Sequence, residues 1–169
     1  MCNPYKVESS LPNPSTRNFL YFSPLPPLQV PPLTFLLMCG IFAYLNVHST
    51  KTRAEILRTL ITGLKRLEYR GYDSAGVAVD THEGNIAVIK RDGNVSQLDE
   101  LVKEFLSAHA GYGEESVSSH IGISHTRWAT HGPPSVRNSH PHVSDPEHEF
   151  VVVHNGIINN YKVIRAMLE

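Results

Sequence analysis

A cysteine directly follows a methionine at Met38-Cys39 and opens an apolar segment, residues 40–45. If translation starts at Met38 and the methionine is then removed, Cys39 carries both a thiol and a free α-amine. A thiol with its own α-amine as base is one form of an activated nucleophile. In the sequence as written, 38 residues precede Cys39 and its nitrogen lies in a peptide bond. A lone cysteine in an apolar strand is more often a small buried hydrophobic residue, so other residues must decide between the two interpretations.

A first polar cluster, residues 67–76, contains Arg70, Gly71 and Asp73 together with two tyrosines. One interpretation is a turn at the end of a helix in which Gly71 has positive φ. The number of polar groups exceeds what a turn requires. This favours a second interpretation, in which the cluster lines a site.

A second cluster, residues 125–132, places Arg127 beside Trp128, the only tryptophan of the chain, between the hydroxyls of Thr126 and Thr130. A guanidinium group binds a carboxylate through two parallel hydrogen bonds and also stacks on aromatic rings. The combination therefore suits a bound carboxylate with an aromatic ring beneath it.

A third cluster, residues 154–160, contains Asn155-Gly156 after the apolar run 151–153. Asn-Gly at a strand end is most often a tight turn. The asparagine amide and the following glycine N–H are also the donors that an oxyanion hole requires. The sequence leaves both interpretations open.

Other chemistries are disfavoured, and no cofactor or metal is expected. The ten histidines include the close pair His140 and His142 and the neighbours His148 and Glu149, but none has the spacing of a helical zinc motif. No phosphate-binding glycine loop or dinucleotide motif is present. A net charge of −1 gives no reason to expect nucleic acid. Two cysteines make no disulfide framework and favour a reducing compartment such as the cytoplasm. No apolar run reaches the roughly 18 residues of a membrane-spanning helix.

The chain divides into two predicted parts near residue 37. Residues 1–37 contain eight of the twelve prolines and are predicted to form a disordered extension, with polyproline II as the alternative. Their richness in Pro, Leu, Phe and Ser favours translated non-coding sequence upstream of a start at Met38. A proline-rich ligand for a peptide-binding domain is the other interpretation.

Residues 38–169 are predicted to be a mixed α and β domain. Strands are expected at 40–46, 76–80, 86–90, 120–125 and 150–154, the first of them buried on both faces. A capping box at Thr52 and Glu55 begins a helix with one apolar face. A second helix is expected to open at residues 96–99, and residues 161–168 are expected to begin a third helix that the end of the chain cuts short. A turn around residues 82–85 joins two of the strands.

Together these residues resemble one family closely. The segments 39–41, 67–76, 125–132, 138–141 and 154–156 are similar to the glutaminase domain of glutamine–fructose-6-phosphate aminotransferases, which make hexosamine phosphate. The Cys-Gly-Ile opening and the Asn-Gly pair are common to class II glutamine amidotransferases. The run Arg-Leu-Glu-Tyr-Arg-Gly-Tyr-Asp-Ser-Ala-Gly at residues 66–76 is far more specific to the hexosamine enzymes. The resemblance covers residues 38–169 and does not extend to residues 1–37.

The resemblance implies an α+β fold, the N-terminal-nucleophile (Ntn) αββα sandwich, incomplete at the C-terminus. It implies that Cys39 attacks glutamine, with its α-amine as base, and that Asn155 and Gly156 form the oxyanion hole. Arg127 then binds the α-carboxylate of glutamine. The remaining implied site residues line the pocket or lie beside it: Trp128, Thr130, His131, His140, Arg70 and Gly71.

Two functional hypotheses follow. The first is the glutaminase half of a hexosamine-forming amidotransferase, whose partner is a sugar-isomerising domain absent from this chain and whose ammonia serves glucosamine 6-phosphate synthesis from fructose 6-phosphate. The family's acidic motif for the substrate ammonium group is expected beyond Glu169, so the chain is interpreted as an N-terminal fragment. The second is a non-catalytic fragment with a proline-rich tail and a blocked nucleophile. Neither hypothesis involves nucleic acid or a membrane.

Overall fold

The structure is a computed structural model that describes residues 39–81 and 85–169. The predicted extension at residues 1–37, Cys2, Met38 and most of the predicted turn at residues 82–85 lie outside the described residues. The division of the chain near residue 37 therefore stays a prediction.

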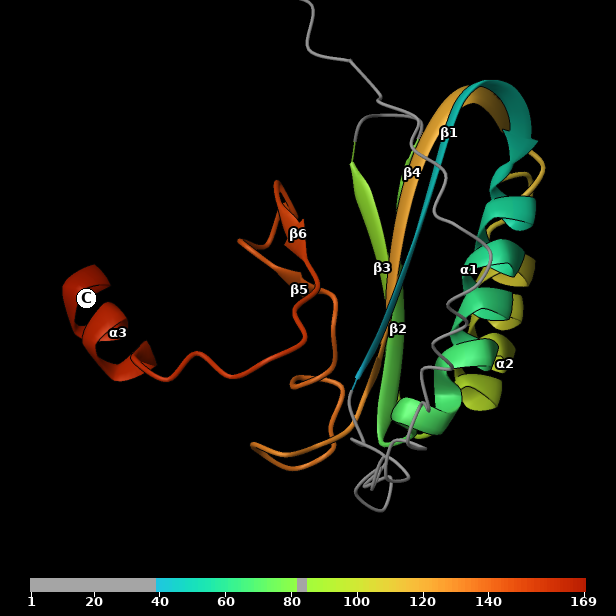
Figure 1. The fold of residues 1–169 in the computed structure, drawn as a ribbon. Coiled ribbons are helices and arrows are strands. Elements are labelled where there is room, and N and C mark those ends of the chain that lie inside the picture. The colour runs from blue at the N-terminus through green and yellow to red at the C-terminus, as the bar shows by residue number, and fades with distance from the viewer. Residues whose placement is uncertain (1–38, 82–84) are drawn as a thin grey trace, which may run out of the picture. The chain divides into compact units, whose positions relative to one another are not determined.

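Four antiparallel strands form the main sheet (Figure 1). They are β1 (Gly40–Thr52), β2 (Ser74–Asp80), β3 (Ile86–Asp92) and β4 (Ser116–Arg127), in the order β1-β4-β2-β3. Two short strands, β5 (His142–Val143) and β6 (Val151–Val152), pair with each other as a separate antiparallel ribbon. Helices and antiparallel sheets together confirm the predicted α+β class.

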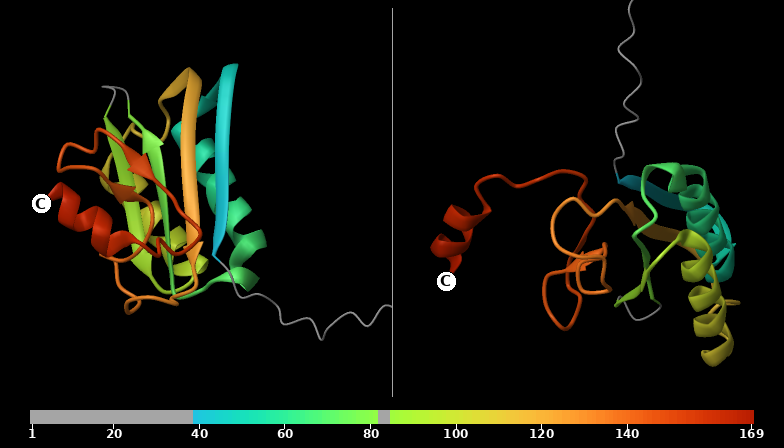
Figure 2. Two further views of the ribbon diagram at one scale, coloured as in Figure 1. Left: turned by 60° about the vertical axis from the view of Figure 1, so that its left-hand side comes forward. Right: turned by 90° about the horizontal axis from the view of Figure 1, so that it is seen from below.

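Helices α1 (Arg53–Leu67) and α2 (Val95–Ala108) lie side by side on one face of the main sheet (Figures 1 and 2). The predicted capping box at the start of α1 is confirmed, since the Thr52 hydroxyl accepts from the N–H of Glu55 and the Glu55 carboxylate accepts from the N–H of Thr52. The predicted opening of α2 at Ser96 is wrong. Asn94 caps this helix and makes its own capping box with Gln97. A single turn, η1 (Glu68–Arg70), follows α1, and α3 (Tyr161–Leu168) begins at the predicted residue.

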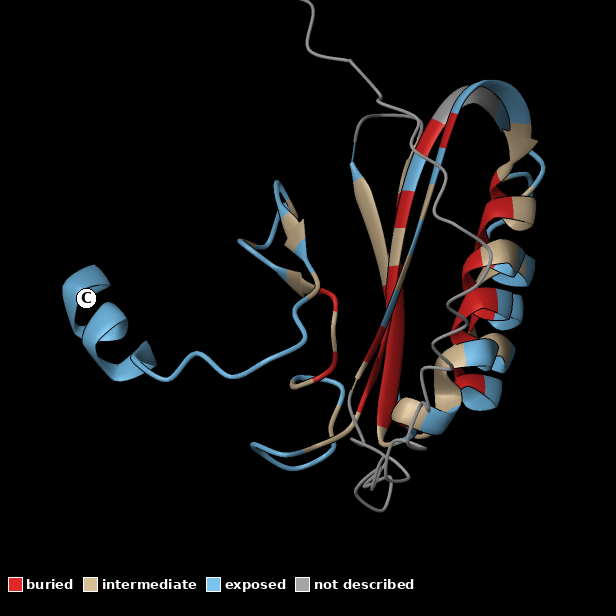
Figure 3. Ribbon diagram, viewed as in Figure 1, coloured by how far each residue is buried: buried red, intermediate tan, exposed pale blue. Residues whose placement is uncertain are grey.

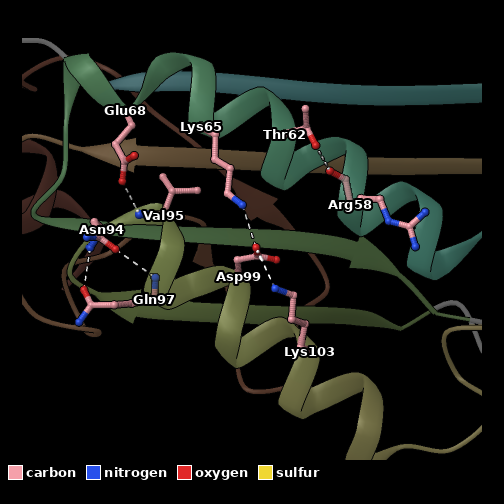
Figure 4. Close-up of polar contacts among 9 residues, drawn as sticks. All are labelled: Arg58, Thr62, Lys65, Glu68, Asn94, Val95, Gln97, Asp99 and Lys103. Carbon is pink, nitrogen blue, oxygen red and sulfur yellow. Dashed lines mark hydrogen bonds and ion pairs between the residues drawn. The ribbon is translucent and has the colours of Figure 1, made fainter.

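The core lies between the helices and the sheet. Residues of the predicted apolar face of α1 are almost inaccessible, and they pack with β2 and with the inner face of α2. These buried residues of α1 are Ile56, Leu57, Leu60, Ile61 and Leu64. At the helix edges, Lys65 Nζ lies 2.8 Å from an Asp99 carboxylate oxygen, and Glu68 accepts the backbone N–H of Val95 at 2.8 Å (Figure 4). These contacts join the start of α2 to the end of α1.

The prediction that β1 is buried on both faces is wrong. Phe42 and Tyr44 pack toward the helices, whereas Ile41 and Leu45 on the opposite face are 42 % and 68 % exposed. Figure 3 colours the ribbon by burial and shows exposed stretches along β1. Leu45 pairs with Ile121 of β4, which is also exposed. Successive side chains of a strand point to opposite faces, and only one face of β1 is covered by described residues.

Strand lengths also differ from the prediction. The strand expected at residues 150–154 has only two residues in β6, because its partner β5 offers only two residues for pairing. The strand expected at residues 120–125 extends over the twelve residues of β4, since β1 and β2 pair along both of its edges. Within the part of the chain that the structure describes, no helix has the length and apolar character needed to cross a membrane.

Candidate active site

Cys39 lies at the start of β1, beside the end of β4. The backbone N–H of Trp128 donates a hydrogen bond to Cys39 Sγ at 3.3 Å, and the carbonyl oxygen of Trp128 is 3.7 Å from the same sulfur. Antiparallel pairing places Gly40 opposite Thr126, which brings these segments together across 89 residues of sequence. Cys39 is partly exposed and forms no disulfide, so its thiol is open to a ligand.

The guanidinium group of Arg127 is mostly buried, with 8 % of the residue exposed. Its Nη1 donates to the carbonyl of Pro133 at 3.2 Å, and its Nη2 donates to the carbonyls of His131 and of Gly132, the latter at 3.2 Å. The loop at residues 131–133 therefore wraps around the Arg127 side chain and is held there by these hydrogen bonds. Glycine suits the loop because Gly132 has a φ of +74°, in the left-handed region.

The loop after Arg127 is also held by the first polar cluster. An Asp73 carboxylate oxygen accepts the backbone N–H of Ala129 at 2.7 Å, and the N–H of Asp73 donates to the carbonyl of Arg127 at 3.1 Å. The Thr126 hydroxyl donates to the carbonyl of Gly71. The ring of Tyr72 meets that of Trp128 edge to face, with 5.1 Å between centroids. The first cluster thus supports the backbone that carries Trp128.

Gly71 is required for close approach and not for a turn. Its φ is −170°, which is extended backbone, so the interpretation with positive φ is wrong. A Cβ at this position would lie 2.5 Å from the carbonyl carbon of Arg127 and 2.7 Å from the nitrogen of Trp128. Only glycine allows the two backbones to pass so closely.

Asn155, near the C-terminal end of the described residues, contacts Cys39, the candidate nucleophile. Its Nδ2 donates to the carbonyl oxygen of Cys39 at 2.7 Å, a contact that joins residues 116 positions apart. Gly156 follows with a φ of +157° in an exposed turn. The two predicted oxyanion-hole donors therefore lie in a turn beside Cys39.

A cavity of about 740 Å³ opens beside Cys39. Seven of the predicted site residues line it: Cys39, Arg127, Trp128, Thr130, His131, His140 and Gly156. Of the other three, Asn155 bonds to Cys39 and Gly71 packs beneath Trp128, as described above. Arg70 does not line the cavity; its guanidinium carbon lies 5.6 Å from the ring centroid of Tyr69.

Several lining residues were not among the predicted ones: Asn138, His142, Val152, His154, Ile157, Ile158, Asn159 and Tyr161. Asp73, which orients the loop, was noted in the first cluster but was not among the predicted site residues. The 138–141 motif pointed to the loop that carries Asn138. His142 was noted only as a neighbour of His140, and His154 only as the first residue of the third cluster, because the folding of β5 and β6 is what brings both to the cavity.

Three imidazole rings pack against one another at the cavity, the first pair tilted by 32° and the second meeting edge to face at 64°. The ring centroids of His125 and His140 are 4.4 Å apart, and those of His140 and His142 are 4.2 Å apart. Burial, then repulsion by His140 and Arg127, lowers the pKa of His125 to about 3. Burial, then repulsion by His142 and Arg127, lowers the pKa of His140 to about 4. The rings of His125 and His140 are therefore neutral at neutral pH. Among the described residues no group of three or more His, Cys, Asp or Glu is arranged to hold a metal ion.

The fold and site define an α+β protein with a cysteine at a strand end, facing a cavity that also contains a buried arginine and an Asn-Gly turn. No protein-family model matches the chain. The chain is 55% identical over 137 residues to glutamine–fructose-6-phosphate aminotransferase [isomerizing] 2 of Bos taurus, 54% identical over 137 residues to that of Homo sapiens, and 50% identical over 132 residues to the enzyme of Saccharomyces cerevisiae.

Each of these matches covers 78% of this chain. The chain spans about a fifth of the length of these curated relatives, 20%, 20% and 18% respectively. The resemblance that the sequence motifs predicted is therefore confirmed: the matched part of this chain is homologous to a limited part of the glutamine–fructose-6-phosphate aminotransferases.

Proposed function

We propose that this chain forms the glutaminase part of a hexosamine-forming amidotransferase, in which Cys39 is the nucleophile. The observation that carries the proposal is the convergence of Cys39, Arg127 and the Asn155-Gly156 turn on one cavity. Three separate segments supply these residues, and each has the chemistry that hydrolysis of glutamine requires.

The proposed reaction has two stages. The thiolate of Cys39 attacks the side-chain amide carbon of glutamine, and the resulting oxyanion accepts hydrogen bonds from Asn155 Nδ2 and the N–H of Gly156. The carbon–nitrogen bond breaks, the nitrogen takes up a proton and leaves as ammonia, and a thioester remains. Water then attacks the thioester, which releases glutamate and restores the thiol.

Arg127 is proposed to bind the α-carboxylate of glutamine. Its guanidinium group lies on the cavity, and the carbonyls of His131, Gly132 and Pro133 fix its orientation. A guanidinium held in place in this way loses little further freedom on binding a carboxylate. The ammonia is proposed to serve a sugar-isomerising domain of the longer protein, consistent with the word "isomerizing" in the relatives' names.

The base is proposed to be the α-amine of Cys39. An amine has this role only when Cys39 is the first residue, because an amide nitrogen delocalises its lone pair into the carbonyl. A chain in which residues precede Cys39 corresponds to the alternative, a non-catalytic fragment with a blocked nucleophile.

We also propose that the complete domain is an αββα sandwich. The exposed apolar face of β1 and β4, with Ile41, Leu45 and Ile121, supports this proposal, since a second sheet packed there would bury it. The helix α3 is fully exposed and presents Ile164, Met167 and Leu168 to solvent, as expected of an element that lacks its packing partner.

The test uses an electrophilic glutamine analogue and peptide mass mapping. Two versions of the chain are compared, one beginning at Met1 and one at Cys39, with both N-termini confirmed by mass. We expect labelling of Cys39 only in the version that begins at Cys39, with protection by excess glutamine and no labelling in Cys39→Ala. Equal labelling of Cys2 and Cys39 in the version that begins at Met1, or labelling of the version that begins at Cys39 that glutamine does not slow, would refute the proposal and support the non-catalytic alternative.

A further inference from the structure

The clustered histidines include one whose ring contacts the backbone of the residue directly before the Asn155-Gly156 turn. The backbone N–H of His154 donates a hydrogen bond to Nδ1 of His140 at 3.3 Å. His154 directly precedes the turn, and Asn155 in turn bonds to the carbonyl of Cys39. A short path therefore runs from the His140 ring to the proposed oxyanion-hole donors.

An imidazole accepts a hydrogen bond at Nδ1 only when that nitrogen carries no proton. The neutral ring then carries its proton on Nε2. A protonated ring donates from both nitrogens and would face the His154 N–H with another donor. The contact in the structure thus defines both the charge and the tautomer that His140 must have.

The surroundings of His140 favour that neutral state from every side. The ring of His125 on β4 packs against its face, the ring of His142 on β5 meets it edge to face, and the positive charge of Arg127 lies close by. Lys90 on β3 donates to the carbonyl of Ser139 at 3.2 Å and repels positive charge on His142. Burial lowers the pKa of His140, repulsion from His142, Arg127 and His154 lowers it further, and the backbone of Val152 opposes part of this effect.

The packing of residues 139–142 against the main sheet fixes the position of the ring. A Cβ on Gly76 of β2 would collide with the carbonyl oxygen of His140, so this segment lies directly on the strand. Ser139 is fully buried, and its hydroxyl donates to the carbonyl of Ser135 at 2.7 Å. The acceptor is therefore attached to a rigid part of the fold, whereas residues 154–161 are exposed.

We propose that His140 is a positioning residue, whose unprotonated Nδ1 holds the His154 N–H and thereby fixes the Asn155-Gly156 turn beside Cys39. The role given to the turn rests on the proposed glutaminase function. The hydrogen bond itself does not, and it can be tested separately in the whole chain.

The first measurement is nuclear magnetic resonance of the unaltered chain at neutral pH. The ring ¹⁵N shifts of His140 are expected to show an unprotonated Nδ1 and a protonated Nε2. The opposite tautomer, or a ring that is charged at pH 7, would overturn the proposal without any variant.

The second measurement compares His140→Asn with His140→Leu. Asparagine carries Oδ1 on Cγ, where histidine carries Nδ1, so it keeps an acceptor, whereas leucine has a similar branched shape and no acceptor. Solvent exchange of the His154 amide should be roughly 3- to 10-fold faster in His140→Leu than in His140→Asn, the scale of one net hydrogen bond. His142→Leu, which removes a neighbouring ring and leaves the acceptor, should not accelerate this exchange. Equal exchange in both His140 variants would overturn the proposal.

The third measurement is the labelling rate of the version that begins at Cys39. His140→Leu should lower the maximal rate with the glutamine analogue more than it weakens the analogue's binding, and His140→Asn should restore part of that rate. If amide exchange separates the two variants but no version is labelled, the glutaminase proposal fails and the positioning contact stands. If labelling is normal in His140→Leu, the contact has no catalytic consequence and the positioning role is wrong.

Discussion

Gly71→Ala tests whether close backbone packing beneath Trp128 determines both stability and reactivity. The added Cβ would lie 2.5 Å from the carbonyl carbon of Arg127 and 2.8 Å from its oxygen. Carbon atoms pack favourably at about 3.5–4.0 Å, so the end of β4 has to move by about 1 Å. Such a shift cannot remain local, because Arg127 pairs with Ser74 of β2 and its guanidinium group binds three carbonyls of the following loop.

The expected loss of stability is about 2–3 kcal/mol, the upper part of the range for an overpacked site, since backbone and not a flexible side chain must move. The same shift displaces the Trp128 N–H, which now lies 3.3 Å from Cys39 Sγ. A misplacement of about 1 Å in a site can lower a rate by roughly 10²-fold. The substitution should therefore impair labelling of Cys39 by the glutamine analogue far more than its modest size suggests.

Urea unfolding measures the first effect, and the labelling rate of the version that begins at Cys39 measures the second. Gly113→Ala is the matched control, because its Cβ would meet the flexible end of Leu106 at 3.0 Å and Ala54 at 3.4 Å. We expect the control to remain within about 0.5 kcal/mol of the unaltered chain. If Gly71→Ala unfolds at the same urea concentration as the control, or is labelled as fast as the unaltered chain, the reasoning is refuted.

Three further predictions follow from buried charge and from the site. Glu115→Ala leaves the Arg53 guanidinium, 2 % exposed, without its ion-pair partner, and should cost about 3 kcal/mol in urea unfolding; a loss below about 1 kcal/mol would contradict the burial argument. The pKa of His125 is lowered from 6.5 to about 3 in the folded chain, so the unfolded chain binds the proton first on acidification. The free energy of unfolding is therefore unaffected by His125 above pH 6.5 and should fall between pH 6.5 and pH 3 by up to roughly 1.4 kcal/mol per pH unit. Urea unfolding at several pH values measures this slope, and His125→Leu should reduce it. Arg127→Lys keeps the charge and loses the planar fork, so it should weaken binding of the glutamine analogue more than it lowers the maximal labelling rate. Asn155→Ala should instead lower the maximal labelling rate by about 10²–10³-fold. The same defect in both variants would contradict their assigned roles.

The sequence alone determined the local elements. The capping box at Thr52 and Glu55, the apolar face of α1 and the start of α3 all depend on residues within a few positions of one another, so a short stretch of sequence predicts them. The antiparallel pairing of β2 and β3 followed from two apolar runs with a short connection. The motifs around Cys39 and residues 66–76 also predicted the resemblance to the glutamine–fructose-6-phosphate aminotransferases, which the comparisons confirmed for the matched part of the chain.

Only the tertiary structure decided how the separate segments meet. Strand pairing places Trp128 beside Cys39 and leaves Arg70 away from the cavity. The stack of His125 and His140 requires a loop to pack across β2 and β4, and no local pattern predicts it. The exposed face of β1 was likewise missed, because an apolar run in the sequence does not show whether one face of the strand or both faces are covered. Contacts between residues far apart in the chain depend on register and packing, which are properties of the whole fold and not of any short segment.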